Sequence, residues 1–273
     1  MKPEMNISRV LFLMINALAF SLASAQDSDT EALAKAAQNP VSSLISVPFQ
    51  WNSNFDVGPL DKPQHVLNIQ PVYPISLNDD WNLITRTILP FISQPSFGQG
   101  QSRETGLGDI QFSAFFSPTK PTSGGWIWGA GPILQLNTAG DDRLGQGAWG
   151  LGPAAVALKI VGPWVVGGLL NNVWSLSEDT GRADVNQLLF QPFINYNFAD
   201  HPGRYLTFAP VITANWEATS DKWIVPLGIG MGQITKIGKQ PVNLQASFYY
   251  NVERPDFAPR YQVRLQIQLM FPK

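Results

Sequence analysis

The chain has 273 residues and a formal net charge of −2, and only 14% of its residues are charged. Soluble domains average roughly 25% charged residues. The near-neutral charge without a basic stripe excludes an electrostatic basis for nucleic-acid binding. The absence of cysteine excludes both a disulfide framework and a thiolate metal site.

The N-terminus has the pattern of an export signal. Lys2 and Arg9 precede an apolar run at 10–22, and Ala-Ser-Ala follows at 23–25. A membrane anchor is the alternative, but the run is short for a span and a small-residue cleavage site follows it directly. We predict a signal peptide over residues 1–25.

Residues 26–44 are polar and contain one candidate helix, in "TEALAKAAQNP", that Asn39-Pro40 would end. We predict a periplasmic N-terminal segment here. Residues 45–273 then alternate between apolar and polar side chains almost without interruption, as strands with two unlike faces do. The candidate strands are 45–55, 65–77, 81–92, 107–118, 126–137, 148–160, 164–175, 185–198, 204–217, 222–234, 242–252 and 260–271.

The connections between these twelve strands fall into two classes. Short ones such as "VGP" and "KIGKQP" alternate with longer, more acidic ones such as "NTAGDDRLGQG" and "SQPSFGQGQSRETG". Alternation of short turns and longer loops is typical of an up-and-down outer-membrane barrel. An even number of strands also allows the sheet to close with both termini on the periplasmic side.

The last strand, "RYQVRLQIQLMF", raises the question of which face points inward. A soluble β-sandwich would bury its apolar face, whereas a membrane barrel turns that face to lipid. Each strand is about twice the usual length, long enough to cross an apolar band of about 25 Å. The polar faces are rich in glutamine and asparagine, and tryptophans gather at the strand ends, as interfacial aromatics do. The tryptophans are Trp81, Trp126 and Trp164 at one end, and Trp149, Trp174, Trp216 and Trp223 at the other.

We therefore predict an all-β fold, an antiparallel up-and-down transmembrane β-barrel of about 12 strands in the outer membrane of a Gram-negative bacterium. Membrane lipid and the outer-membrane insertion machinery are the expected partners, with no nucleic acid.

Several stretches together resemble one bacterial outer-membrane family. They are "NPVSSLISVPFQWN" (39–52), "GLGDIQFSAFFSP" (106–118), "GAWGLGPAAVALK" (147–159), "GPWVVGGLLNNVWS" (162–175), "ITANWEA" (212–218) and "PVNLQASFYYNVERP" (241–255). The family is named after the meta pathway of phenol degradation, and its members are often catalogued as transporters or as neuromedin U-like. The resemblance implies a barrel that passes small organic compounds such as aromatics, and it carries over no catalytic residue.

An enzyme is the main rival among barrels, because outer-membrane hydrolases pair a serine or threonine with a histidine base. The chain has two histidines. His65 shares a strand face with Leu67, Ile69 and Tyr73, and His201 lies in a short turn. Neither has a serine at an informative sequence spacing, although partners distant in sequence stay open. We predict no enzymatic activity, no metal site and no cofactor.

Charged and amide side chains on the predicted lumen face are the candidates for selectivity, because charge lining a pore sets what passes. The alternative is that they pair with one another and fill the lumen. Aromatic side chains at Phe115, Phe193 and Tyr249 could stack on a solute or obstruct the bore. The selectivity candidates are Arg86, Asp109, Gln191, Glu217, Arg260 and Arg264.

The function predicted from the sequence is passive passage of small, aromatic or hydrophobic, organic solutes, with selectivity set by the lumen and by loops such as 94–106. Two alternatives remain: an outer-membrane lipid hydrolase, and a closed structural or adhesive barrel.

Overall fold

The computed structural model describes residues 27–98, 100–176 and 184–272. The predicted signal peptide at 1–25 lies outside these residues. A helix, α2 (Asp27–Ala37), precedes the first strand. None of the helices in the described part of the chain is long and apolar enough to cross a bilayer.

The described residues after the helix form fifteen strands in one sheet. The strands are β1 (Ile45–Val57), β2 (Lys62–Ile69), β3 (Val72–Ser76), β4 (Trp81–Gln94), β5 (Glu104–Leu107), β6 (Ile110–Pro118), β7 (Trp126–Leu136), β8 (Gly150–Val161), β9 (Trp164–Ser175), β10 (Asn186–Asn197), β11 (Arg204–Phe208), β12 (Ile212–Asn215), β13 (Trp223–Ile237), β14 (Gln240–Glu253) and β15 (Tyr261–Phe271).

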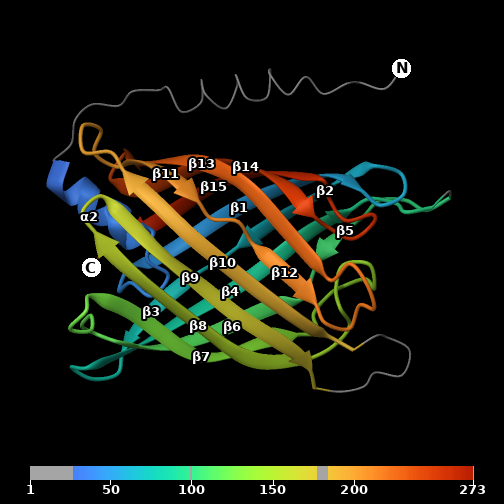
Figure 1. Ribbon diagram of the computed structural model, residues 1–273, viewed down its shortest axis with the longest axis horizontal. Helices are drawn as coiled ribbons and strands as arrows, with labels where there is room; N and C mark the ends of the chain where they lie inside the picture. The colour runs from blue at the N-terminus through green and yellow to red at the C-terminus, as the bar shows by residue number, and fades with distance from the viewer. Residues whose placement is uncertain (1–26, 99, 177–183, 273) are drawn as a thin grey trace.

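The sheet closes on itself as an antiparallel barrel (Figure 1). β1 pairs with β15 from Ile45↔Phe271 to Phe55↔Tyr261, so the first and last strands complete the ring. Three pairs of strands, β2 with β3, β5 with β6, and β11 with β12, each form one interrupted crossing. The fifteen described strands therefore make twelve crossings, and the predicted twelve-stranded barrel is confirmed.

The three interruptions lie where the chain departs from regular pairing. Gln70-Pro71 separates β2 from β3, Gly108-Asp109 separates β5 from β6, and residues 209–211 separate β11 from β12. Proline lacks the N–H that a ladder hydrogen bond needs, which explains the first and third breaks, at Pro71 and Pro210. At the second and third breaks, the carbonyls of Gly108 and Ala209 accept hydrogen bonds from side chains.

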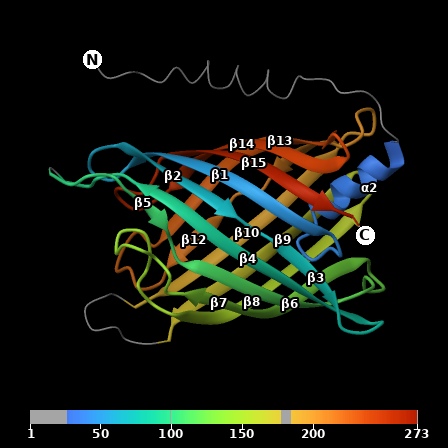
Figure 2. The ribbon, with the colours of Figure 1, turned by 180° about the vertical axis from the view of Figure 1, so that it is seen from behind.

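The barrel has two unlike ends. At one, which we call the turn end, short connections at 77–80, 162–163 and 238–239 join neighbouring strands. Helix α2 and the C-terminus lie at this end (Figures 1 and 2). At the other, which we call the loop end, the connections include the longer loops 95–103 and 137–149.

The outer surface of the barrel is apolar. In β15, Leu265 and Ile267 point outward and are 41% and 49% exposed, whereas Arg264 and Gln268 point inward and are buried. Such an exterior suits hydrocarbon, and closure leaves no unpaired strand edge facing it. The apolar face of the last strand therefore points outward.

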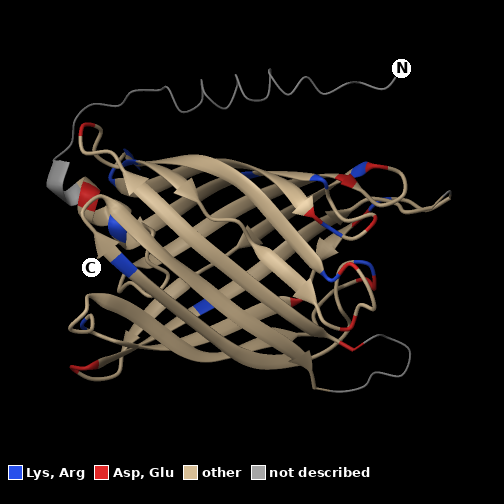
Figure 3. Ribbon diagram, viewed as in Figure 1, with Lys and Arg blue, Asp and Glu red and all other residues tan. Residues whose placement is uncertain are grey.

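Aromatic pairs mark both rims of this apolar surface. Trp81 and Trp128 meet edge to face near the turn end, with ring centroids 5.9 Å apart. Trp216 and Trp223 make the same contact at the loop end, at 5.4 Å. Charged residues also gather at the two ends and are sparse along the wall between them (Figure 3). Both distributions are those of an outer-membrane barrel.

Candidate functional site: the barrel lumen

The lumen encloses a cavity of about 440 Å³. Its wall comes from strands all round the barrel, and residues 36–40 and Ser42 line it at the turn end. Cavities of this size are typical of small-molecule sites. The chemistry of the cavity follows from which residues the strands turn inward.

One arc of the wall, formed by β14, β15, β1 and β2, presents amides. Beyond the cavity, on its loop-end side, a series of side-chain hydrogen bonds of 2.5–3.1 Å starts at the cavity-lining Arg264 and runs from β15 through β1 and β2 to β4, each side chain donating to the next. Such a series is polarised by the guanidinium at its start, which strengthens successive bonds. The series runs Arg264, Gln262, Asn54, Gln64 and Gln94, in that order.

On the opposite side, a buried apolar cluster formed mainly by β6 to β9 fills part of the lumen, and four of its members, Phe115, Ile133, Leu169 and Phe193, line the cavity beside polar residues such as Gln111 and Gln191. On β8, for example, Ala154, Val156 and Leu158 point inward and are buried. The sequence expectation of inner faces rich in glutamine and asparagine does not hold on β8. Small barrels fill their interior with side chains, so a strand apolar on both faces is compatible with the fold. The buried cluster comprises Val41, Ile84, Phe115, Ile133, Ala154, Val156, Leu158, Val165, Leu169, Val173 and Phe193.

The last residues of helix α2 and those that follow it enter the turn end of the barrel. Val41 is 5% exposed and belongs to the apolar cluster of the lumen. Gln38 and Asn197 exchange two amide hydrogen bonds, of 2.9 and 3.2 Å, which fix the segment to β10. Ala34 of the helix packs on Ile234 and Met270. We call residues 36–42 the N-terminal segment; it partly closes the cavity on this side.

Arg264 lies in the lumen wall and is 4% exposed. It donates to Asn52 Oδ1 at 3.2 Å and to the Ala209 carbonyl at 3.2 Å, besides its bond to Gln262. Its guanidinium lies 4.8 Å from the centroid of the Tyr249 ring, a cation–π contact. The Ala209 carbonyl belongs to the break between β11 and β12. This break therefore provides a hydrogen-bond acceptor for Arg264.

Arg86 faces the same cavity from β4. Its Nη2 donates to Oε1 of Gln70, the residue at the break between β2 and β3. Ile84, two residues away on the same face, belongs to the apolar cluster. Arg86 therefore lies where the amide arc meets the apolar cluster.

Tyr205 is an inward residue that sequence reasoning did not single out. It is buried, and its hydroxyl donates to Asn243 Oδ1 at 2.8 Å. Its ring occupies the space above Gly232, where a Cβ would lie 2.1 Å from Tyr205 Cζ. The run of alternate glycines in "GIGMG" was the available signal, because a strand without side chains on one face admits a ring from its neighbour.

Asp109 borders the cavity, but its carboxylate accepts hydrogen bonds from a loop. Its carboxylate accepts the backbone N–H groups of Thr138 at 3.2 Å, Ala139 at 3.1 Å and Gln146 at 2.5 Å. Gly145 approaches so closely that a Cβ there would lie 2.7 Å from both carboxylate oxygens. Asp109 thus fixes loop 137–149 to the barrel wall.

Three other candidates have different positions. Gln191 lines the cavity from β10. Glu217 follows β12 and lies beside Trp174 at the loop end. Arg260 precedes β15 and is half exposed, with its Nε 3.6 Å from Asp56 Oδ2. The expected lumen positions of Glu217 and Arg260 are corrected, because both lie beyond the ends of their strands.

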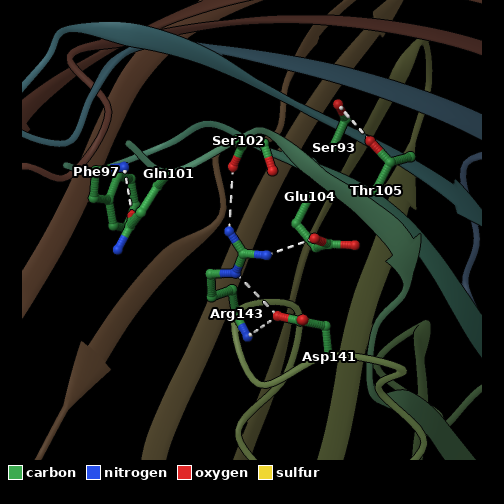
Figure 4. Close-up of polar contacts among 8 residues, drawn as sticks. All are labelled: Ser93, Phe97, Gln101, Ser102, Glu104, Thr105, Asp141 and Arg143. Carbon is green, nitrogen blue, oxygen red and sulfur yellow. Dashed lines mark hydrogen bonds and ion pairs between the residues drawn. The ribbon is translucent and has the colours of Figure 1, made fainter. Parts of the chain in front are cut away.

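A second polar network joins two loops at the loop end (Figure 4). Arg143 donates to Glu104, to Asp141 at 3.1 Å and to the Ser102 carbonyl at 3.2 Å. The hydrogen bond to Asp141 is the main reason that the pKa of Arg143 is raised above its ordinary value. The guanidinium therefore stays charged across the working pH range, and it links loop 137–149 to loop 95–103.

The outer surface near the loop end brings a serine to a histidine. Ser53 Oγ lies 3.1 Å from His65 Nδ1, and Trp51 Nε1 donates to the same hydroxyl at 2.9 Å. The rings of Trp51 and His65 stack at 5.4 Å. Sequence spacing could not have found this pair, because strand pairing alone brings the two residues opposite each other. Among the described residues, none hydrogen-bonds to the other ring nitrogen of His65.

In the described part of the chain, no three histidine, aspartate or glutamate side chains converge as metal ligands.

No family model matches the chain, and no curated protein matches it by sequence. Solved structures do resemble it. An outer membrane channel from Pseudomonas putida F1 is 18% identical over 91% of this chain and 100% of its own, with a TM-score of 0.64. This likeness concerns the fold, and it agrees with the closed barrel and apolar exterior: the chain is a β-barrel of the Gram-negative outer-membrane type.

Two further structures are more distant. The dimeric outer membrane phospholipase of Salmonella typhi with bound calcium is 13% identical, covers 91% of this chain and 99% of its own, and has a TM-score of 0.47. The β domain of the Bordetella autotransporter BrkA is 10% identical, with 84% and 100% coverage and a TM-score of 0.45. Neither bears on the function of this chain.

Proposed function

We propose that the protein is a channel for passive passage of small organic compounds, aromatic or otherwise apolar in part, across the outer membrane. The observation that carries the proposal is the lumen with two unlike walls around a cavity of about 440 Å³. The turn end, with helix α2 and the C-terminus, faces the periplasm, as in other barrels of this type. The sequence resemblance to the phenol meta-pathway family supports the same solute class.

The two walls lower the free-energy barrier to crossing in different ways. Amides of the polar arc replace water around the polar part of a solute, as pore-lining groups do in selective channels. Side chains of the apolar cluster, including Phe115, Ile133 and Leu169, accept its apolar part. No bond is made or broken, and no cofactor is required.

Single-channel recording of the purified protein in planar bilayers tests this proposal. We expect discrete current steps, and swelling of proteoliposomes in isotonic solutions of small solutes. A pure, folded barrel that never conducts and admits no solute would instead support the closed structural or adhesive alternative.

A lipid hydrolase is the second candidate, because Ser53 and His65 lie within hydrogen-bonding distance on the lipid-facing surface. A serine nucleophile also needs its base to be oriented by a third group. The assay is release of fatty acid from fluorescent phospholipid vesicles by the wild type, Ser53→Ala and His65→Ala, with His201→Ala as the control. The channel proposal predicts no release by any of them. Release lost only in Ser53→Ala and His65→Ala would establish the hydrolase.

A further inference from the structure

Two arginines face the lumen cavity without an acidic partner. Arg86 and Arg264 both line it, and among the described residues no carboxylate lies within ion-pair distance of either. Asp109 is the one carboxylate that borders the cavity in the described chain, and it already accepts three backbone N–H groups. The positive charge of the two guanidinium groups is therefore not neutralised by the cavity wall.

The two guanidinium groups also retain unused donors. A guanidinium has five N–H groups. Within the described residues, Arg86 uses one, on Gln70, and Arg264 uses three, on Asn52, Ala209 and Gln262. Arg86 thus presents most of its donors to the cavity. A planar fork of donors matches a carboxylate in both geometry and charge.

The surroundings of Arg86 specify what else the ligand carries. Ile84 on the same strand face and Phe115, its partner on β6, belong to the apolar cluster. Ile133 and Leu169 continue this apolar wall within the same cavity. A molecule held at Arg86 by a carboxylate would therefore place an apolar body against these side chains.

We propose that the lumen is a binding site for small monocarboxylates with an aromatic or aliphatic body, with Arg86 as the principal carboxylate receptor and Arg264 as a second positive charge. Such a ligand neutralises a cation inside the barrel that otherwise lacks a counter-charge and satisfies its free N–H groups. The inference deepens the proposed channel function by naming the solute class, since the same cavity serves both.

Equilibrium dialysis of the full-length protein in detergent, against a detergent-only blank, tests the site. The probes are radiolabelled benzoate, benzamide as its neutral isostere, and acetate as the carboxylate without an apolar body. We expect benzoate to bind about tenfold or more tightly than either other probe, the scale of one charge-assisted hydrogen bond. Equal binding of benzoate and benzamide would overturn the inference.

Substitutions test whether Arg86 is the residue that binds the carboxylate of benzoate. Arg86→Gln should weaken benzoate binding about tenfold and leave benzamide unchanged, whereas Arg143→Gln, which alters a loop arginine, should leave both unchanged. Benzoate binding that survives in Arg86→Gln would also overturn the inference. If Arg86→Gln fails to fold, Arg86→Lys serves, because it keeps the charge but loses the fork and should weaken benzoate binding only in part.

The binding experiment and the conductance experiment can fail independently, so loss of the carboxylate site is distinguishable from loss of the channel function. A protein that conducts in bilayers but does not distinguish benzoate from benzamide retains the channel function and loses the carboxylate site. A protein that binds benzoate but never conducts retains the site and loses the channel function.

Discussion

Gly232 is a residue at which the addition of a single methyl group should disturb the lumen. A Cβ there would lie 2.1 Å from the Tyr205 ring, which is buried and bonded to Asn243. We expect Gly232→Ala to lower the free energy of unfolding by about 1–3 kcal/mol, as overpacking does. The measurement is urea unfolding in lipid vesicles. Gly140→Ala, where no atom lies within 4 Å of the new Cβ, is the matched control and should unfold like the wild type.

Asp109 is expected to determine the order of loop 137–149. Asp109→Ala removes the acceptor of three backbone N–H groups. The loop then loses a set of charge-assisted bonds, each contributing about 1.5–3 kcal/mol. Limited trypsin digestion should cleave after Arg143 faster in this variant than in the wild type or in Asp79→Ala, a control at the turn end. Unchanged cleavage would show that other contacts hold the loop.

At this scale the sequence predicts positions within strands better than positions at their ends. Strict alternation put Arg86, Gln191 and Arg264 on the inner face, and all three line the cavity. Glu217 and Arg260 were placed by the same alternation, but each lies just outside its strand, where the period of two no longer determines direction. The close approach of Ser53 to His65 depends on cross-strand register, which one strand's sequence does not contain.

Among the elements, the N-terminal segment is the part of the fold expected to limit conductance. Residues 36–40 and Ser42 border the cavity at the turn end, and Val41 and Gln38 fix the segment to the wall. Deletion of residues 27–42 should therefore raise single-channel conductance while leaving the barrel folded. Glu31→Gln, which changes only the exposed Glu31–Lys35 pair of the helix, should conduct like the wild type. Equal conductance of the deletion variant would place the narrowest point elsewhere.

The sequence predicts the crossings but not their interruptions. Twelve segments of alternating character correspond to twelve crossings. Pro71 and Pro210 interrupt two of them, yet Pro48 lies inside β1 without a break, and its carbonyl accepts from Gln70. Whether a proline breaks a barrel strand depends on whether its nitrogen faces a neighbouring carbonyl. That direction is fixed by register, so it could not be foreseen.

For the whole molecule, composition and alternation together predict a barrel, because few charges and long two-faced strands suit lipid outside and polar groups within. They do not predict that a buried apolar cluster fills one side of the lumen. On β8 both faces are apolar, so its sequence is equally consistent with a strand buried on both sides. The division of the lumen into two walls becomes visible only when the order of strands around the ring is known.

In the membrane, the outward faces of the strands should meet hydrocarbon and the inward faces water, and the absence of native cysteine makes this directly measurable. Spin labels at Gln266→Cys and Ile267→Cys, adjacent residues of β15, are compared in lipid vesicles for collision with oxygen and with a water-soluble nickel complex. We expect the label at 267 to collide mainly with oxygen and the label at 266 mainly with the nickel complex. The reverse pattern, or equal access of both labels to the nickel complex, would contradict the account.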